Sequence, residues 1–486
     1  MHSKRAETVS YAETISRNPA MKVSKQESED IQSLFQGEPA EVDKKLEVAG
    51  IEYIKVGVFD IDGILRGKYM KRGKFISALK GGFGFCDVVL GWDSNDQLYD
   101  KSEFTGWHTA YPDANVRLLP DTARVLPYEP NCAMVLAEFT DKAENICPRG
   151  LLRRVLAKAD DMGFAVKSSC EFEFFLFEET PHSVREKNYK DLNSMTPGFF
   201  GYSVLRNSVH SDFYHEFMEM CDAMRMPIEG LHTETGPAVL EAALLYDDAL
   251  ESADQAALFK TFTKVMAQRK GMMATFMAKW SKDYPGQSGH MHVSMQDKKT
   301  GKAVFFDETK PHDMSDEMRW FVGGQQQLMP ELLSMVASTV NSYSRLIPGF
   351  WAPTSATWGV ENRTCALRVI QGGEKSQRVE YRIGAADINP YIALAATIGS
   401  GLWGIENKIE PNAPLKGNAY EQEVADALTF PATLFEAAGR LRKSKAAEAL
   451  FGADFVTHYA QSREWEEREF RKAITDWEMQ RYFEII

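Results

Sequence analysis

The stretch Arg378-Val379-Glu380-Tyr381-Arg382 decides the architecture that we predict for the rest of the chain. In a β-strand successive side chains point to opposite faces of the sheet, so Arg378, Glu380 and Arg382 share one face. Charges of both signs are costly to bury unless they meet partners. Two interpretations follow: a solvated edge strand with a ladder of ion pairs, or one wall of a charged functional site.

Two other stretches repeat this two-faced pattern and favour the second interpretation. Glu171 and Glu173 share one face of the run CEFEFFLF, which is rich in the aromatic residues that strands prefer. His290 and His292 share one face of the run GHMHVSM. Three separated strands would therefore each present charged or metal-ligating groups on one face and apolar groups on the other.

Two carboxylates so close together in apolar surroundings repel each other, and a divalent cation relieves that repulsion. Carboxylates with one imidazole suit Mg²⁺ or Mn²⁺ better than Zn²⁺, which prefers closed nitrogen and sulfur sites. Arginines beside such a site indicate that phosphate or carboxylate is bound there. The combination predicts a metal-nucleotide site, with a metal-dependent hydrolase as the alternative.

Length and composition limit the classes of protein to which this chain can belong. Its 486 residues, 44% of them hydrophobic, can form two to four domains with sizeable cores. The 56 basic and 69 acidic residues give a net charge of −13, which argues against bulk binding to nucleic acid or anionic membrane. Six widely spaced cysteines and the lack of a secretory signal or membrane-spanning run predict a cytoplasmic protein.

The order of helix, strand and turn signals predicts three segments. Residues 1–40 form an N-terminal extension, partly disordered and partly helical. Residues 41–145 form a small α+β domain, and residues 146–486 form a large one. Pro148 begins the first helix of the large domain.

Local signals within these segments predict individual turns and helix starts. The Asp62-Gly63 pair between two β-rich runs predicts a hairpin. Pro120 and the aspartate after it predict a turn. Asn389-Pro390 is typical of a helix start and precedes an apolar run that we expect to be buried.

These residues resemble the glutamine synthetase superfamily, on its bacterial type I side, over roughly residues 45–486. The run from Lys279 to Ser294, which ends in H-x-H-x-S, is similar to the ATP-binding signature of that family. Further residues follow in the family's order and spacing: RLIPG from Arg345, ENR from Glu361, then Arg368, Lys375, Arg378, Glu380, Arg382 and NPY from Asn389. The resemblance implies an α+β fold, with a small β-grasp-like domain and a catalytic domain of curved antiparallel sheet backed by helices.

The resemblance also implies roles for the matching side chains. One Mg²⁺ or Mn²⁺ ion would be held by Glu173, Glu234 and Glu241, and a second by Glu171, His290 and Glu380. Glutamate and the amine would be bound by Arg345, Arg382, Gly286, Tyr202 and Trp351. ATP would be bound by His292, Ser294, Lys375, Arg378 and Arg368. Catalytic roles would fall to Arg363, Arg345 and Asp93.

The reaction implied by the resemblance has two steps. The γ-carboxylate of glutamate attacks the terminal phosphate of ATP, and an amine then displaces phosphate from γ-glutamyl phosphate. Family members are homo-oligomers, commonly dodecamers of two hexameric rings, with each site shared between neighbours. In that arrangement the loop that carries Asp93 would cover the site of the next subunit.

The chain departs from glutamine synthetases where those enzymes bind ammonium. In them the proline-glycine loop continues with a tyrosine and a glutamate that closes over the ammonium site, whereas Phe350 and Trp351 stand here. This exchange removes charge and adds apolar surface. We therefore expect the branch of γ-glutamyl-amine and γ-glutamylanilide synthetases, with an aromatic or short alkyl amine as acceptor. A glutamine synthetase that uses ammonia, and a catalytically silent structural relative, are the alternatives.

Overall fold

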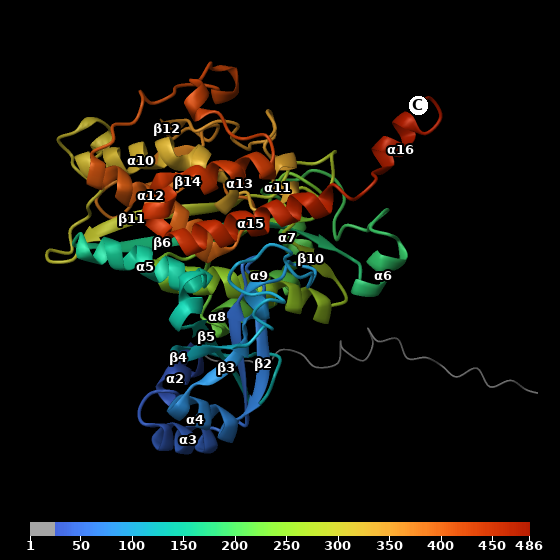
Figure 1. Ribbon diagram of the computed structural model, residues 1–486, viewed down its shortest axis with the longest axis vertical. Coiled ribbons are helices and arrows are strands. Elements are labelled where there is room, and N and C mark those ends of the chain that lie inside the picture. Colours follow the sequence, from blue (N-terminus) through green and yellow to red (C-terminus); the bar gives the residue numbers. More distant parts are fainter. Residues whose placement is uncertain (1–24) are drawn as a thin grey trace, which may run out of the picture.

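The computed structural model describes residues 25–486, so residues 1–24 of the predicted N-terminal extension, which spans residues 1–40, lie outside the described residues. Two sheets organise the chain: five strands form the sheet of the small domain, and nine form that of the large domain. The small domain lies below the large one in Figure 1. Helices back both sheets, which confirms the predicted α+β class.

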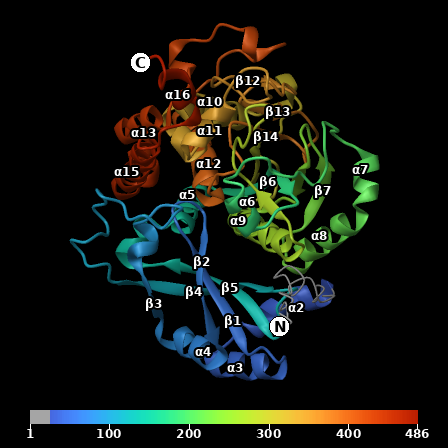
Figure 2. The same cartoon turned by 90° about the vertical axis from the view of Figure 1, so that its right-hand side faces the viewer.

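The small domain is built on a mixed sheet with the strand order β2-β1-β5-β4-β3. The strands are β1 Tyr53–Phe59, β2 Leu65–Lys71, β3 Phe83–Cys86, β4 Asp113–Val125 and β5 Cys132–Phe139. β1 and β5 are parallel, and the other neighbours are antiparallel. Helices α3 (Pro39–Val48) and α4 (Arg72–Gly81) cover the face that is turned away from the large domain (Figure 2).

One local prediction for the small domain is confirmed and one is wrong. β1 and β2 pair antiparallel on either side of Asp62-Gly63, as the hairpin signal predicts. Gly63 has a φ of 77°, a conformation that favours glycine. The turn predicted at Pro120 does not form, because β4 continues through this residue and pairs with β5 on both sides of a register shift between Leu119 and Arg124. An irregularity of this kind is where a strand tolerates proline.

Helix α2 (Lys25–Leu34) leads into residues that pack onto the small domain. Ile31 and Phe35 are buried, and the ring of Phe35 lies edge-on to that of Phe75, with the ring centroids 5.5 Å apart. We therefore propose that the small domain begins near residue 25. Its end near residue 145 stays a prediction.

The large domain is built on a curved sheet with the order β12-β13-β14-β11-β6-β8-β7, and β9 and β10 also pair with β6. The strands are β6 Phe164–Phe177, β7 Ile228–Thr233, β8 Val239–Leu244, β9 Asp247–Asp248, β10 Met273–Thr275, β11 Gly289–Asp297, β12 Trp358–Val360, β13 Leu367–Ile370 and β14 Arg378–Tyr381. All pairings are antiparallel except that of β12 with β13.

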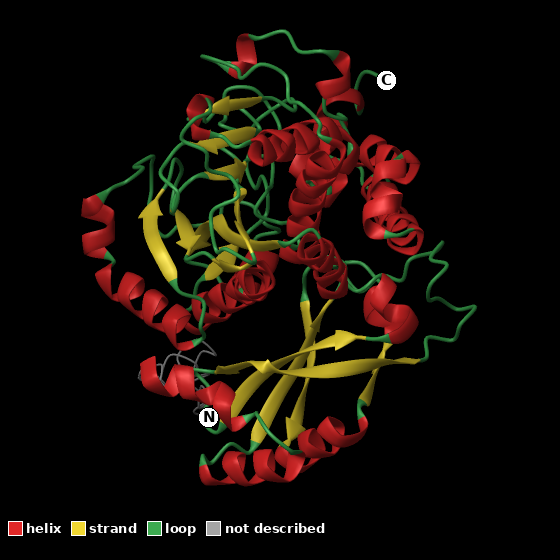
Figure 3. Ribbon diagram, turned by 90° about the vertical axis from the view of Figure 1, so that its left-hand side faces the viewer, coloured by secondary structure: helices red, strands yellow, loops and turns green. Residues whose placement is uncertain are grey.

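Helices gather beside the strands of the large domain, as Figure 3 shows. They include α5 Pro148–Asp161, α8 Ser211–Ala223, α9 Ala249–Arg269, α10 Asp316–Leu332 and α12 Pro390–Asn407. The C-terminal helices are α13 Leu434–Lys443, α14 Lys445–Phe451, α15 Ala453–Phe470 and α16 Asp476–Tyr482, the last of which projects from the body in Figure 1. In the described part of the chain, no helix is both long and apolar enough to cross a membrane.

The two faces of β6 separate apolar from charged side chains. Phe172 and Phe174 are buried against Phe259 of α9, with ring centroids 6.3 and 6.1 Å apart. Apolar burial of this kind contributes about 25 cal/mol per Å², so it fixes which face of the strand turns to the helices. Glu171 and Glu173 consequently project from the opposite face.

The start of α12 joins the two domains. Asn389 caps the helix, because its Oδ1 accepts a hydrogen bond from the backbone N of Tyr391 at 3.1 Å. Its Nδ2 donates to the carbonyl oxygens of Asp60 and Ile61 at 3.0 and 3.2 Å. A Cβ at Gly63 would lie 3.0 Å from Cα of Asn389, so the hairpin turn sits directly on the helix cap.

Candidate active site

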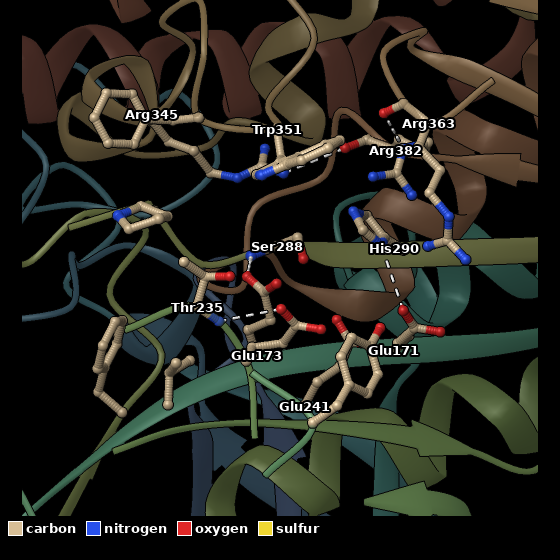
Figure 4. Close-up of a pocket in the computed structure, with 17 residues that line it drawn as sticks. Glu171, Glu173, Thr235, Glu241, Ser288, His290, Arg345, Trp351, Arg363 and Arg382 are labelled. Carbon is tan, nitrogen blue, oxygen red and sulfur yellow. Dashed lines mark hydrogen bonds and ion pairs between the residues drawn. The ribbon is translucent and has the colours of Figure 1, made fainter. Parts of the chain in front are cut away.

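The charged face of the large sheet lines a cavity of about 430 Å³. Its lining comprises Glu171, Glu173, Phe175, Tyr202, Glu234, Thr235, Val239, Glu241, Pro285, Gly286, Ser288, His290, Arg345, Phe350, Trp351, Arg363 and Arg382. Strand pairing brings these positions together, since Glu173 lies opposite Glu241 and Glu171 lies opposite His290. In Figure 4 the labelled carboxylates lie on one side of the cavity and the labelled arginines on the other.

Two groups of side chains on the acidic side could each hold a cation. Within each group the ligand atoms lie no more than 4.8 Å apart; the first is Glu171, Glu241 and His290, and the second is His232, Glu234 and Glu241. Glu380 adjoins the first group, because its Oε1 lies 3.4 Å from Nδ1 of His290. Glu173 is outside both groups and accepts a hydrogen bond from the backbone N of Ser288 at 2.6 Å.

The electrostatics of the first group fit a divalent cation. Burial, together with the charges of Glu171 and Glu173, raises the pKa of Glu241 to about 9. Burial and the nearby Arg382 lower the pKa of His290 to about 4, so its imidazole is neutral, as a metal ligand must be. Both ring nitrogens of His290 are buried without a hydrogen-bond partner in the described structure. Crowded carboxylates beside an unsatisfied imidazole are what Mg²⁺ or Mn²⁺ would stabilise.

His232 belongs to the second group although the sequence analysis did not select it. Its Nε2 lies 3.1 Å from Glu234 and 3.3 Å from Glu241. Burial opposes the charged form, but these two contacts raise the pKa of His232 to about 10. Tyr202 stacks on the imidazole, with ring centroids 4.5 Å apart. The period-two alternation that selected Glu171 and Glu173 also pairs His232 with Glu234, so the signal was present in the sequence.

The arginine side of the cavity carries excess positive charge. Arg345 is 2% exposed and donates to the carbonyl oxygens of Ile383 and Arg382 at 3.0 and 3.3 Å. Burial lowers its pKa to about 10, and in the described residues it forms no ion pair. Arg363 reaches the same cavity from the loop between β12 and β13. Unpaired guanidinium groups here suit an anionic ligand.

Gly286 brings the backbone close to these arginines. A Cβ at this position would lie 2.6 Å from the carbonyl oxygen of Ala278 and 2.7 Å from Cγ of Arg345. Only glycine fits this close approach without displacing one of them. Gly286 lines the cavity beside this arginine, and its role in binding glutamate stays a prediction.

Four of the five residues predicted to bind ATP, His292, Ser294, Arg368 and Arg378, lie along the same sheet face, beyond the first cation group. His292 has its Nε2 3.6 Å from Glu171 and its Nδ1 3.4 Å from Nε of Arg378. Arg368 is bonded to Glu380 at 3.0 Å. Ser294 follows on β11, one alternation beyond His292.

Two predicted site residues lie away from the cavity of their own chain. Lys375 is exposed on the loop before β14. Asp93 is 6% exposed in the small domain. Its Oδ1 accepts from the backbone N of Asn95 and Gln97 at 2.8 and 2.9 Å, and its Oδ2 accepts from Nε1 of Trp465 at 2.9 Å. Their predicted roles are therefore not supported by proximity within one chain.

An aromatic wall formed by Phe350, Trp351 and Tyr202 lines part of the cavity. Phe350 and Trp351 come from the loop after α11 (Val340–Arg345), and Tyr202 comes from the segment before α7 (Val204–Val209). Trp351 is 61% exposed and has a φ of 59°, which non-glycine residues rarely adopt. The wall therefore presents aromatic surface to the cavity, and neither Phe350 nor Trp351 supplies a carboxylate.

Comparison with known proteins identifies the family. A family model described as glutamine synthetase, catalytic domain, matches residues 145–482. The chain belongs to the glutamine synthetase family. Members of this family use ATP and divalent metal ions, and the acidic and imidazole groups described above could bind such ions.

Relatives within the glutamine synthetase family are named for different reactions, which differ in the amine that is joined to glutamate. The chain is 45% identical to type-1 glutamine synthetase 2 of Dictyostelium discoideum, covering 91% of this chain and 85% of that one. It is 37% identical to a glutamate–isopropylamine ligase of Pseudomonas sp, covering 91% and 97%. It is 34% identical to a γ-glutamylethanolamide synthetase of Streptomyces coelicolor, covering 89% and 93%. A solved structure of ligand-free GmaS superimposes with a TM-score of 0.79 at 25% identity, covering 91% and 99%.

Proposed function

We propose that this protein is an ATP-dependent ligase that joins the γ-carboxylate of glutamate to an organic amine through γ-glutamyl phosphate, releasing ADP and phosphate. Family membership supports the ligase chemistry. The observation that carries the choice of amine is the wall formed by Phe350, Trp351 and Tyr202, which lines the same cavity as Glu234. An apolar wall of this kind favours an alkyl or aromatic amine over ammonium, which carboxylates hold best.

The arginine side of the cavity would bind the anionic substrates. Arg345 and Arg382, both nearly buried, would hold the carboxylate of glutamate against the backbone at Gly286. Arg363, which is exposed and lines the cavity, would reach the phosphate as it is transferred. Preorganised positive charge of this kind stabilises the transfer electrostatically, because negative charge develops on the phosphoryl oxygens.

The acidic side would hold the divalent ions, which when bound neutralise the phosphates of ATP. Glu171, His290 and Glu380 would form one set of ligands. Glu173, Glu234 and Glu241 would form the other. We add His232 to it, because its Nε2 is 3.1 Å from Glu234 and a cation bound between these carboxylates would displace the proton that they now stabilise on the imidazole. His292, Ser294, Arg378, Arg368 and Lys375 would bind ATP. An ADP complex of GmaS, which shares this fold, supports a nucleotide site here.

A glutamine synthetase that uses ammonia is the second candidate. The 45% identity to the Dictyostelium discoideum glutamine synthetase favours it. The two candidates differ only in the acceptor, since both form γ-glutamyl phosphate. Their predictions therefore diverge in an assay that varies the amine alone.

That assay measures ADP release with glutamate, ATP and Mg²⁺ or Mn²⁺ against ammonium, ethylamine, isopropylamine, aniline and putrescine. We expect the highest kcat/KM with a monoamine that has an alkyl or aromatic tail. A kcat/KM for ammonium above that of every organic amine would overturn the proposed acceptor. ADP release without product in mass spectra would overturn the ligase activity itself.

The predicted homo-oligomer of two hexameric rings also stays a proposal. Its support is apolar surface beside the cavity, where Phe199, Phe200 and Leu205 are 51%, 55% and 70% exposed. Such surface is costly to leave in water. Sedimentation velocity of the full chain tests the assembly, and a purely monomeric protein would contradict it.

A further inference from the structure

Lys279 is a buried cation beside the cavity to which no metal or substrate role has been given. Lys279 is only 7% exposed, and burial lowers the pKa of its ammonium group. Among the described residues its ammonium group has no carboxylate within ion-pair distance. A buried lysine that lacks a counter-ion is costly, so its remaining contacts indicate what its charge is used for.

The main chain of Lys279 is clamped to the helix that carries an active-site arginine. Its backbone N donates to Oδ1 of Asn341 at 2.7 Å, and its carbonyl oxygen accepts from Nδ2 of Asn341 at 2.8 Å. Asn341 lies in α11, whose last residue is Arg345, and a capping box at Thr339 and Ser342 fixes the start of that helix. The position of Lys279 is therefore set by the same element as that of Arg345.

The side chain of Lys279 then reaches two different loops of the cavity. Its Nζ donates to the carbonyl oxygen of Tyr284 at 2.6 Å, two residues before Gly286. The same Nζ lies 4.2 Å from the ring centroid of Phe350, the neighbour of Trp351. A desolvated ammonium on a phenyl face is attractive, so one charge holds the glutamate-side loop and the amine-side loop together.

We propose that Lys279 is a positioning residue that sets the Phe350-Trp351 wall relative to the glutamate-binding loop, and thereby determines which amines are accepted. This inference rests on the proposed function, because its test measures turnover with organic amines. Within the loop part of the wall, Trp351 is 61% exposed, whereas Phe350 contacts the ammonium group of Lys279. Without the ammonium, Phe350 loses its partner and the wall can move away from the acceptor.

Lys279→Met, which keeps the length of the side chain and removes its charge, tests the proposal. We expect kcat/KM for the best amine to fall about tenfold, mainly through the KM of the amine, while the KM of ATP is unchanged. Lys279→Arg, whose guanidinium also packs on ring faces, should restore most of the amine preference. Lys282→Met, an exposed lysine of the same loop, is the matched control and should behave as wild type.

A double-mutant cycle separates positioning from general destabilisation. Phe350→Leu should reproduce the loss, and the double variant Lys279→Met with Phe350→Leu should lose no more than Phe350→Leu alone. Losses of kcat/KM that add up in the double variant would overturn the proposal. An equal rise of the KM values for ATP, glutamate and the amine in Lys279→Met would also overturn it. If wild type accepts only ammonium, the proposed acceptor fails, yet the same cycle with ammonium still decides whether the two residues are coupled.

Discussion

Replacing Glu380 tests the first cation group most directly, because this carboxylate contacts both the imidazole of His290 and two arginines. Glu380 is 2% exposed, lies 3.4 Å from His290 and 3.0 Å from Arg368, and is ion-paired with Arg382. Glu380→Ala leaves two largely buried guanidinium groups without this partner. Glu380→Gln keeps the shape and an acceptor oxygen but removes the charge.

The magnitudes follow from burial. Removing one partner of a buried ion pair costs about 3–5 kcal/mol, so Glu380→Ala should lower the free energy of unfolding by that amount. Unfolding entropy is about 1 kcal/mol/K for a chain of 486 residues, so the thermal midpoint should fall by about 3–5 °C. Glu380→Gln should cost about 1–3 kcal/mol. Both variants should weaken Mn²⁺ binding by at least about tenfold and abolish ATP-dependent phosphate release.

Calorimetric titration with Mn²⁺, thermal unfolding with and without the ion, and phosphate release together provide the assay. Glu361→Gln is the matched control, since Glu361 is the other carboxylate on Arg368 but is 47% exposed. We expect it to cost under about 1 kcal/mol and to leave Mn²⁺ affinity unchanged. Wild-type Mn²⁺ affinity together with wild-type turnover in Glu380→Gln would refute the metal assignment of this residue.

Three further predictions concern other parts of the molecule. Trp351→Glu should raise the ratio of kcat/KM for ammonium to kcat/KM for an organic amine by about tenfold or more, whereas Trp351→Phe should not. An unchanged ratio in Trp351→Glu would contradict the proposal that the aromatic wall selects organic amines. His232→Gln should weaken Mn²⁺ binding at Glu234 and Glu241 by about tenfold, and calorimetry showing equal affinity would remove it from the ligand set. Burial, then the charge of Lys264, lowers the pKa of Lys260 to about 7, below its unfolded value of 10.5. The unfolded state therefore binds more protons between these values, and the free energy of unfolding should rise from pH 7 to pH 10. Lys260→Met should abolish this rise in urea titrations, and a rise that persists would exclude Lys260 as its source.

The sequence predicted the sheet-borne part of the site because strand alternation carries the information. Glu171 and Glu173 had to share a face once Phe172 and Phe174 were assigned to the core. The family resemblance then supplied which distant residues would meet at one ion, and the register of β6 with β8 and β11 brings Glu241 and His290 next to Glu173 and Glu171. Patterns of period two are local, so they survive without any knowledge of tertiary contacts.

The features that the sequence did not reveal depend on contacts between distant segments. The turn signal at Pro120 was overridden because β4 gains a partner, β5, on both sides of the proline. The sequence shows Lys279 only as the first residue of the ATP-binding signature. Its contact with Asn341, 62 residues away in the chain, appears only in the structure. Asp93 carried a family expectation, whereas its oxygens are engaged by its own loop and by Trp465.

These contrasts indicate how one fold can serve relatives named for different acceptors. Most of the proposed cation ligands stand on hydrogen-bonded strands, where a shifted residue would turn its whole face away from the cavity; they are Glu171, Glu173, Glu241, His290 and Glu380. The acceptor wall stands on loops, with Trp351 in a left-handed conformation and Phe350 held by one ammonium group. We therefore expect substitutions in the wall to change the amine preference while leaving cation binding intact, because the wall shares no strand with these carboxylates. A variant that changed acceptor preference and Mn²⁺ affinity together, from a substitution at Phe350 or Trp351 alone, would show that this separation is false.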